Sequence, residues 1–190
     1  MSAAGAKPKL KPAIFLDRDG VLIRTFVRNG VPHPPDHLSE MEVLPGIHEA
    51  LKRLKDAGLE LIVVTNQPDV ARGTQPRETI EEMNAQLTRN LQLDGVFVCY
   101  HDNADGCTCR KPKAGLILQA AEAHGLDVAA SFMVGDRWSD IAAGASAGCR
   151  TLLVDRPYSD RGRCAPDFVV DDLPAAAEVI LQQLATRTPR

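Results

Sequence analysis

The sequence lacks a long apolar run, a signal-like leader and any excess of positive charge. Its 190 residues carry 22 basic and 25 acidic side chains, and only 4% of them are aromatic. No segment approaches the roughly 20 apolar residues of a membrane-spanning helix, so we expect no membrane partner. Large apolar residues are scarce in 1–12, which predicts a cytoplasmic protein without a secretory signal. The acidic balance and the few aromatic residues argue against a nucleic-acid partner.

Cysteine is also scarce, and its odd count argues against a disulfide framework. Three of the five cysteines nevertheless lie close together: Cys99, Cys107 and Cys109 combine with His101 in the pattern C-x-H-x5-C-x-C. Four such ligands can close a tetrahedral shell around Zn²⁺ with no open position, which is typical of structural zinc sites. We therefore predict a structural zinc loop over 99–109 that holds the following Lys111 in place.

Short apolar runs alternate with amphipathic segments along the chain. Strands are predicted at 13–18, 59–65, 95–99, 132–135 and 151–154, with a candidate sixth at 168–170, and helices at 45–55, 74–91, 114–124, 139–147 and 175–185. This alternation predicts an α/β fold, a three-layer Rossmann-like parallel sheet with helices on both faces. We expect 1–12 to be a disordered tail and 13–190 to form one domain that contains the zinc loop.

Polar side chains follow three of the predicted strands. Asp17 and Asp19 end the first strand and should project to the same side, with Arg18 opposite. The strand at 132–135 is followed by Asp136 and Asp140, and the strand at 59–65 ends in Thr65. Because ligands of such folds sit beyond the carboxyl ends of the strands, these groups should meet there. Carboxylates that converge in this way suit Mg²⁺ better than Zn²⁺.

Four segments in the same order carry a family resemblance. FLDRDGV, VVTNQ, CRKP and GDRWSD resemble the four motifs of the haloacid dehalogenase superfamily of phosphohydrolases, over about 13–155. The resemblance implies that Asp17 is the nucleophile that takes the phosphoryl group. It also implies that Asp19 is the general acid for the leaving alcohol and then the base for water.

The resemblance further implies the rest of the site. Thr65 would bind the transferring phosphoryl group, and Lys111 would neutralise its charge. Magnesium would be held by Asp17, by Asp136 and by Asp19 through its backbone carbonyl, with Asp140 in support. The gaps between motifs leave no room for a cap domain, so a capless, open site is expected, bordered by an irregular segment over 20–45.

The zinc loop narrows the resemblance to one branch of the superfamily. This branch contains phosphatases of D-glycero-D-manno-heptose 1,7-bisphosphate and of histidinol phosphate. The x5 interval resembles the histidinol-type loop, whereas TNQPDVARG resembles the heptose side. The first loop has basic residues and no acid before Asp36, which suits a second phosphate better than the ammonium group of histidinol phosphate.

These observations favour a monomeric enzyme that removes the 7-phosphate of a small phosphorylated sugar, the heptose bisphosphate. Substrate-binding groups are predicted at Thr65, Asn66, Arg110, Lys111, Arg137 and Arg28. Histidinol-phosphate phosphatase and, behind it, a nucleic-acid end-phosphatase remain alternatives. His33 and His37 are interpreted as surface residues because Asp19 already fills the acid–base role.

Overall fold

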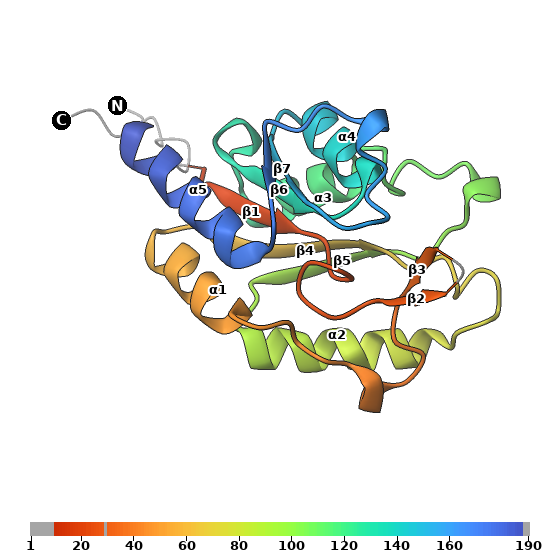
Figure 1. The fold of residues 1–190 in the computed structure, drawn as a ribbon. Coiled ribbons are helices and arrows are strands. Elements are labelled where there is room, and N and C mark those ends of the chain that lie inside the picture. Colours follow the sequence, from red (N-terminus) through yellow and green to blue (C-terminus); the bar gives the residue numbers. More distant parts are fainter. Residues whose placement is uncertain (1–9, 29, 188–190) are drawn as a thin grey trace, which may run out of the picture.

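The computed structural model describes residues 10–28 and 30–187. Its centre is a six-stranded sheet in the order β5-β4-β1-β6-β7-β8, and every neighbouring pair of strands is parallel (Figure 1). The strands are β1 (Ala13–Leu16), β4 (Glu60–Asn66), β5 (Gly95–Cys99), β6 (Phe132–Gly135), β7 (Arg150–Val154) and β8 (Phe168–Val170). The predicted parallel sheet is confirmed, and the candidate strand at 168–170 is its edge strand.

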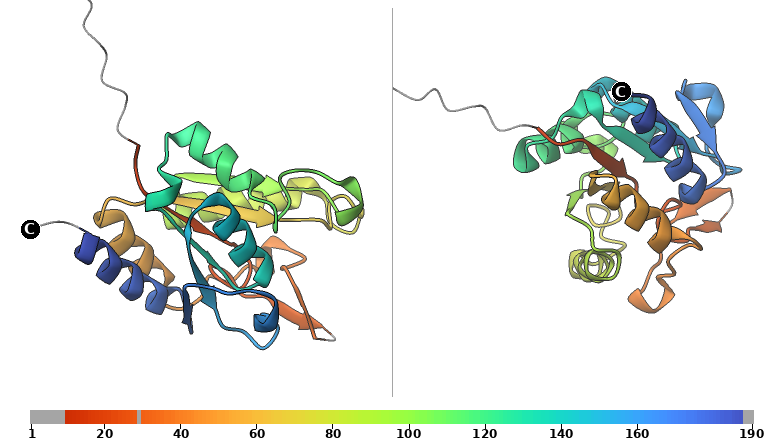
Figure 2. Two further views of the ribbon diagram at one scale, coloured as in Figure 1. Left: turned by 90° about the horizontal axis from the view of Figure 1, so that it is seen from above. Right: turned by 90° about the vertical axis from the view of Figure 1, so that its left-hand side faces the viewer.

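Helices cover both faces of the sheet, as predicted (Figures 1 and 2). They are α1 (Ile47–Asp56), α2 (Arg77–Leu91), α3 (Gly115–His124), α4 (Trp138–Ala147) and α5 (Leu173–Arg187). Apolar side chains of α1, α2 and α5 share one core cluster, and those of α3 and α4 share the other. No helix among the described residues has the length and hydropathy needed to cross a bilayer.

The first strand shows why its sequence is apolar without alternation. Ile14 and Leu16 belong to the core beneath α1 and α5, whereas Ala13 and Phe15 belong to the core beneath α3 and α4. Successive side chains of a strand point to opposite faces, and here both faces are covered. The strand ends at Leu16, and the N–H of Asp17 still donates to the backbone oxygen of Val134 in β6, so the chain leaves the sheet after Asp17.

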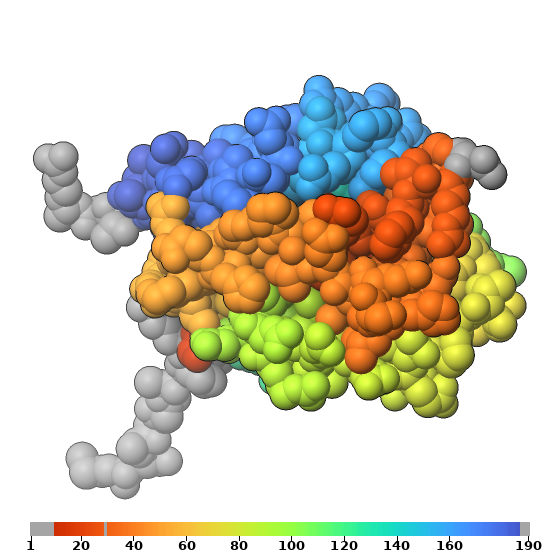
Figure 3. Space-filling model, turned by 60° about the horizontal axis from the view of Figure 1, so that its bottom comes forward, coloured from red at the N-terminus to blue at the C-terminus, as the bar shows by residue number. Residues whose placement is uncertain are grey.

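The segment 20–45 is not irregular as expected. It holds an antiparallel hairpin of β2 (Phe26–Arg28) and β3 (Val31–His33), followed by a short 3-10 helix, η1 (Leu38–Glu40). Strands of three residues are too short for periodicity to reveal. In Figure 3 this segment lies beside α2, and the amide of Gln75, just before that helix, donates to the backbone oxygen of Pro35.

Several boundaries differ from expectation by one to three residues, and the largest difference is at the helix predicted over 74–91. The helix predicted from Thr74 begins at Arg77, and Thr74 does not cap it but donates its hydroxyl to the backbone oxygen of Asp69. The reason is Pro76, which disfavours helical geometry at the preceding Gln75. Of the predicted tail, 1–9 lies outside the described residues. Lys11 bonds to the backbones of residues 125 and 127, so the ordered chain begins before Ala13.

Candidate active site

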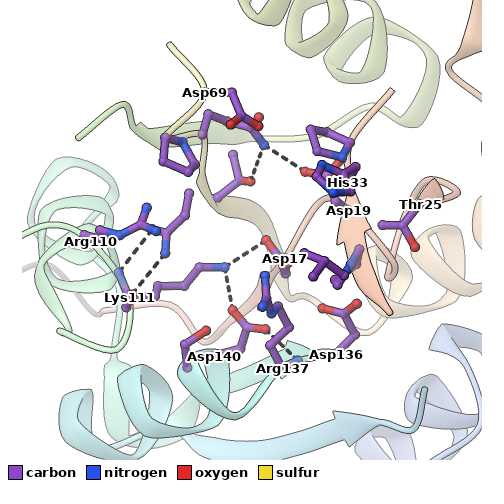
Figure 4. Close-up of a pocket in the computed structure, with 18 of the residues that line it drawn as sticks. Asp17, Asp19, Thr25, His33, Asp69, Arg110, Lys111, Asp136, Arg137 and Asp140 are labelled. Atoms are coloured by element: carbon purple, nitrogen blue, oxygen red, sulfur yellow. Dashed lines mark hydrogen bonds and ion pairs between the residues drawn. The ribbon is translucent and has the colours of Figure 1, made fainter. Parts of the chain in front are cut away.

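The carboxyl ends of β1, β4 and β6 meet where the chain reverses its direction across the sheet. From β1 it proceeds to β4 and β5 on one side, and then returns to place β6 on the other side of β1. Such switch points are where open α/β sheets bind ligands. A cavity of about 390 Å³ lies there, and Asp17, Asp19, Thr65, Asn66, Arg110, Lys111, Asp136, Arg137 and Asp140 are among its lining residues (Figure 4).

Lys111 is the buried cation of the site. Its Nζ atom lies 2.8 Å from Asp17 Oδ1, 2.6 Å from Asp140 Oδ1 and 2.8 Å from the backbone oxygen of Val64. Burial lowers the pKa of this ammonium group, but the carboxylates of Asp140 and Asp17 outweigh burial and raise the pKa above its usual value. Lys111 therefore stays charged at the place where Asp17 would meet a phosphoryl group.

Asp136 completes a cluster of three buried carboxylates. One oxygen each of Asp17, Asp136 and Asp140 lie within 4.8 Å of one another. Neither carboxylate oxygen of Asp136 has a hydrogen-bond partner of acceptable geometry among the described residues. Burial, together with the charges of Asp17 and Asp140, raises the pKa of Asp136 well above its ordinary value.

This arrangement fits a hard divalent cation. Three buried carboxyl groups face one ammonium group, so the cluster carries excess negative charge when all three are ionised. Two orphaned, buried oxygens on Asp136 are costly without a partner, and oxygen ligands suit Mg²⁺. Glycine at position 20 makes room for the Asp136 carboxylate, because a Cβ atom there would lie only 2.0 Å from Asp136 Oδ2.

The Asp19 side chain takes another direction. Its Oδ2 atom accepts from Gln67 Nε2 at 2.8 Å and from Arg18 Nε at 3.1 Å, and its Oδ1 atom accepts from Arg18 Nη2 at 3.2 Å. The Asp19 carboxylate is therefore not part of the three-carboxylate cluster, although it lines the same cavity. Gln67 also donates to Thr65 Oγ1 at 3.0 Å, which links Thr65 to Asp19.

The Asn66 side chain holds the backbone of Lys111. Its amide donates to the backbone oxygen of Lys111 at 3.0 Å, and its carbonyl accepts from the backbone N–H of Lys111 at 3.1 Å. This two-point clamp fixes the backbone that carries the Lys111 ammonium group. Asn66, predicted as a substrate ligand, thus lines the cavity but uses its side-chain amide to position Lys111.

The four predicted zinc ligands converge at the carboxyl end of β5. The sulfur atoms of Cys99, Cys107 and Cys109 are 3.2–3.8 Å apart, and His101 Nδ1 lies 3.6 Å from Cys99 Sγ and 3.3 Å from Cys109 Sγ. A tetrahedral zinc with Zn–S bonds of about 2.3 Å needs S···S edges of about 3.8 Å. The spacing is far too long for disulfides, and the donor set fits a tetrahedral metal.

The zinc loop is anchored on both sides. Arg72, in the loop after β4, donates to both carboxylate oxygens of Asp102 at 2.9 and 2.8 Å and lowers the pKa of that carboxyl to about 2. Arg110 Nε donates to Asn103 Oδ1 at 2.8 Å. At the start of α3, a Cβ atom on Gly115 would lie 2.3 Å from the backbone oxygen of Thr108. Glycine therefore lets α3 pack directly against the loop.

The predicted cations of the first loop do not reach the cavity. Arg28 pairs with Asp36 at 2.7 Å and Arg24 pairs with Glu42 at 3.0 Å, both on the exposed surface. Neither arginine lines the cavity. The interpretation of Arg28 as a substrate ligand is therefore not supported. Arg28 is neutralised by Asp36, 8 positions further along the chain, and Arg24 by Glu42, 18 positions further along.

Several cavity residues were not predicted. His33, interpreted as a surface residue, lines the cavity because the β2–β3 hairpin folds back over it. Gln67 shares a motif with Thr65, and the period of two along an extended chain could have revealed that both face the same side. Tyr158, from the loop after β7, was not predicted either; it does not line the cavity, but its hydroxyl group lies 2.9 Å from Oγ1 of the cavity residue Thr25. Burial and Asp136 raise the pKa of Tyr158.

Known proteins resemble this chain over most of its length. A family model described as HAD-hydrolase-like matches residues 108–176. The D-glycero-beta-D-manno-heptose-1,7-bisphosphate 7-phosphatase of Yersinia pestis is 37% identical over 183 residues, which covers 87% of this chain and 94% of that protein. The enzyme of the same name from Escherichia coli K12 is 36% identical and covers 92% of this chain and 96% of its own length.

Solved structures agree with these relatives. The D,D-heptose 1,7-bisphosphate phosphatase of B. bronchiseptica, solved with magnesium and phosphate, superposes with a TM-score of 0.79 at 32% identity. The match covers 90% of this chain and 99% of that one. This chain is therefore a phosphatase of the haloacid dehalogenase superfamily and belongs to the same family as these heptose-bisphosphate phosphatases.

Proposed function

We propose that this enzyme removes the 7-phosphate of D-glycero-D-manno-heptose 1,7-bisphosphate through an aspartyl-phosphate intermediate on Asp17. The observation that carries the chemistry is the meeting of Asp17, Lys111 and the orphaned Asp136 carboxylate at one end of the sheet. The names of the relatives, which match nearly the whole chain, support the choice of substrate.

In the first step an Asp17 carboxylate oxygen attacks phosphorus and the sugar oxygen leaves. The Lys111 ammonium group, already 2.8 Å from Asp17, neutralises charge on the transferring phosphoryl group. The Thr65 hydroxyl, oriented by Gln67, is placed to bind a phosphoryl oxygen. Asp19 gives a proton to the leaving sugar oxygen and then takes one from the water that releases phosphate from Asp17.

Two metals complete the proposal. Mg²⁺, held by Asp17 and Asp136 with the Asp19 carbonyl and with Asp140 in support, would shield the attacking carboxylate from the anionic substrate and stabilise phosphoryl charge. Zn²⁺ is proposed for Cys99, His101, Cys107 and Cys109, in a structural role. Free thiols in such a cluster suit a reducing compartment, which supports a cytoplasmic enzyme.

The second phosphate of the substrate needs a cation outside the reacting centre. Of the basic residues that line the cavity, Arg72 and Lys111 are paired with carboxylates. Arg110 and Arg137 also line it, and within the described part of the chain neither forms an ion pair. The Arg110 guanidinium donates from Nε to Asn103 Oδ1 and from Nη1 to the backbone oxygen of His101, which leaves the N–H groups of Nη2 for a ligand. A planar guanidinium without a carboxylate partner can bind phosphate, so Arg110 and Arg137 are the proposed ligands of the distal phosphate.

A substrate comparison tests the proposal. The purified, magnesium-loaded enzyme is assayed for phosphate release from the heptose bisphosphate, histidinol phosphate and a 5′-phosphorylated oligonucleotide, with Asp17→Asn as the inactive control. We expect the highest kcat/KM for the bisphosphate and a loss of at least about 10³-fold in Asp17→Asn. Faster turnover of histidinol phosphate or of the oligonucleotide would overturn the substrate, and full activity of Asp17→Asn would overturn the site.

A further inference from the structure

An arginine lies buried between the two proposed catalytic aspartates. The Arg18 side chain is completely inaccessible to solvent and is the largest fully buried side chain among the described residues. A buried guanidinium is costly unless its donors find acceptors, so its partners say what the fold uses it for. Nothing in the proposed chemistry assigns it a role.

Arg18 forms hydrogen bonds with a residue of α2 and with Asp19. Nη1 donates to Asn84 Oδ1 of α2 at 2.9 Å, while Nε and Nη2 donate to the two carboxylate oxygens of Asp19 at 3.1 and 3.2 Å. Asn84 is itself buried on the side of α2 that faces the sheet. Gln67 completes the set with its 2.8 Å bond to Asp19 Oδ2.

The hydrogen bonds of Arg18 fix the plane of the Asp19 carboxylate as well as its position. A guanidinium is planar, and two bonds to the two oxygens of one carboxylate hold both groups close to a common plane. Arg18 cannot turn about its long axis without breaking the bond to Asn84, and Asn84 cannot move without α2. The plane of the Asp19 carboxylate is thereby tied to α2 through Arg18 and Asn84.

We propose that Arg18 and Asn84 are positioning residues that set the orientation of the Asp19 carboxyl group for proton transfer to the leaving sugar oxygen. This inference rests on the proposed phosphatase mechanism. In that step the bond from Asp17 oxygen to phosphorus forms, the bond from phosphorus to the sugar oxygen breaks, and the Asp19 proton moves to that oxygen. A misdirected Asp19 leaves the first two events possible but deprives the alkoxide of its proton.

The test uses two leaving groups that differ in their need for that proton. A sugar alkoxide is a poor leaving group and needs an acid, whereas p-nitrophenolate is stable enough to leave without one. The parameter kcat/KM reports on the steps up to the release of the leaving group, so it isolates this proton transfer. We compare the wild-type enzyme with Asn84→Ala and with Asn84→Leu, which keeps the side-chain size but removes the acceptor.

We expect both substitutions to lower kcat/KM for the heptose bisphosphate by about 10- to 100-fold, a part of the 10²–10⁴-fold contribution of an acid catalyst. For p-nitrophenyl phosphate the change should stay within about threefold. Asn84→Asp keeps an acceptor oxygen for Arg18 and should restore most of the activity on the sugar substrate. Met83→Ala, at a fully buried neighbour on α2 outside this network, controls for loosened packing.

The outcomes separate cleanly. Equal losses on the two substrates in Asn84→Ala and Asn84→Leu, matched by Met83→Ala, would reduce Arg18 and Asn84 to core residues and overturn the inference. If one Asn84 variant fails to fold, the other carries the comparison, and the Asn84→Asp rescue is read independently. A wild-type enzyme that releases no phosphate from either substrate would instead refute the proposed function on which the inference rests.

Discussion

Asp136 holds its position at an electrostatic cost. Among the described residues its two buried oxygens have no hydrogen-bond partner of acceptable geometry, and its neighbours Asp17 and Asp140 carry the same charge. A carboxyl group whose pKa is higher in the folded than in the unfolded protein destabilises the fold once the pH exceeds the unfolded value. Such local instability is typical of sites that are arranged for a ligand rather than for the fold alone.

Replacing Asp136 by asparagine should therefore have opposite effects on stability and on activity. In magnesium-free, zinc-loaded protein at pH 8 we expect Asp136→Asn to raise the Tm by roughly 2–4 °C, the equivalent of about 1 kcal/mol for a chain of this size. Phosphatase activity and the Tm increase on addition of Mg²⁺ should both be lost. Asp36→Asn, at an exposed acid paired only with Arg28, serves as the control. A lower Tm in the Asp136→Asn protein would contradict this account.

Protons and Mg²⁺ should compete at this cluster. Burial raises the pKa of Asp140 to about 6 and raises that of Asp136 well above its ordinary value, although the Lys111 charge lowers both. Both folded values are raised, so metal-free protein should lose stability as pH rises from about 4 through 6. The Tm increase caused by Mg²⁺ should accordingly be small at pH 5 and larger at pH 8, as scanning fluorimetry can measure. An increase independent of pH would show that these carboxyls do not bind the ion.

The zinc loop is the element that connects β5 to the Lys111 backbone. It contains only the short 3-10 helix η2 (Asn103–Asp105), and ion pairs such as Arg72–Asp102 lie on its exposed surface. Exposed ion pairs contribute little to stability, so the loop needs another source of order. The proposed zinc would provide it through the four converging thiol and imidazole groups, because a metal that binds only the folded loop stabilises the fold.

Loss of one ligand should therefore disorder the loop and remove Lys111 from its place. We expect Cys107→Ser to lose bound zinc and to lower the Tm by on the order of 10 °C, together with most of the activity. Cys164→Ser, which removes a thiol outside the cluster, should change neither. Zinc content is measured by elemental analysis of the purified proteins. Full zinc occupancy and an unchanged Tm in Cys107→Ser would exclude the structural role.

At the scale of the whole molecule, the exposed apolar surface is dispersed. The large apolar residues that are about half exposed lie before β1, on the β2–β3 hairpin, on α3 and on β8, namely Leu10, Val27, Val31, Leu118 and Val169. Stable interfaces of identical subunits are usually built around larger, contiguous apolar areas. The monomer stays a prediction from the sequence.

The predicted monomer can be measured directly. Light scattering coupled to size exclusion should give 20.6 kDa, the mass of one chain, and the value should not change on tenfold dilution. The metal-loaded wild-type protein is used, since loss of zinc would expose the loop and promote association. A mass of twice this value that persists on dilution would contradict the prediction.

Features of the fold and of the site that depend on residues close together in the chain could be predicted from the sequence. Apolar runs bounded by glycine and proline located the strands and helices of the confirmed parallel sheet to within a few residues, because both periodicities are local properties of the chain. The zinc ligands are close in sequence, so their spacing predicted that they meet. The aspartates at the strand ends followed from the rule that parallel strands share one carboxyl edge.

The pairing of charged and polar side chains that are distant in the chain depended on the packing of the fold. Arg28 could have served a phosphate or a nearby acid, and the hairpin gave it Asp36. Arg18 finds Asn84 across 66 residues of sequence, and Lys111 finds Asp17 across 94. Such choices depend on distance and on the loss of water around each charge. Both are set by how helices and strands pack, and no local pattern of residues encodes them.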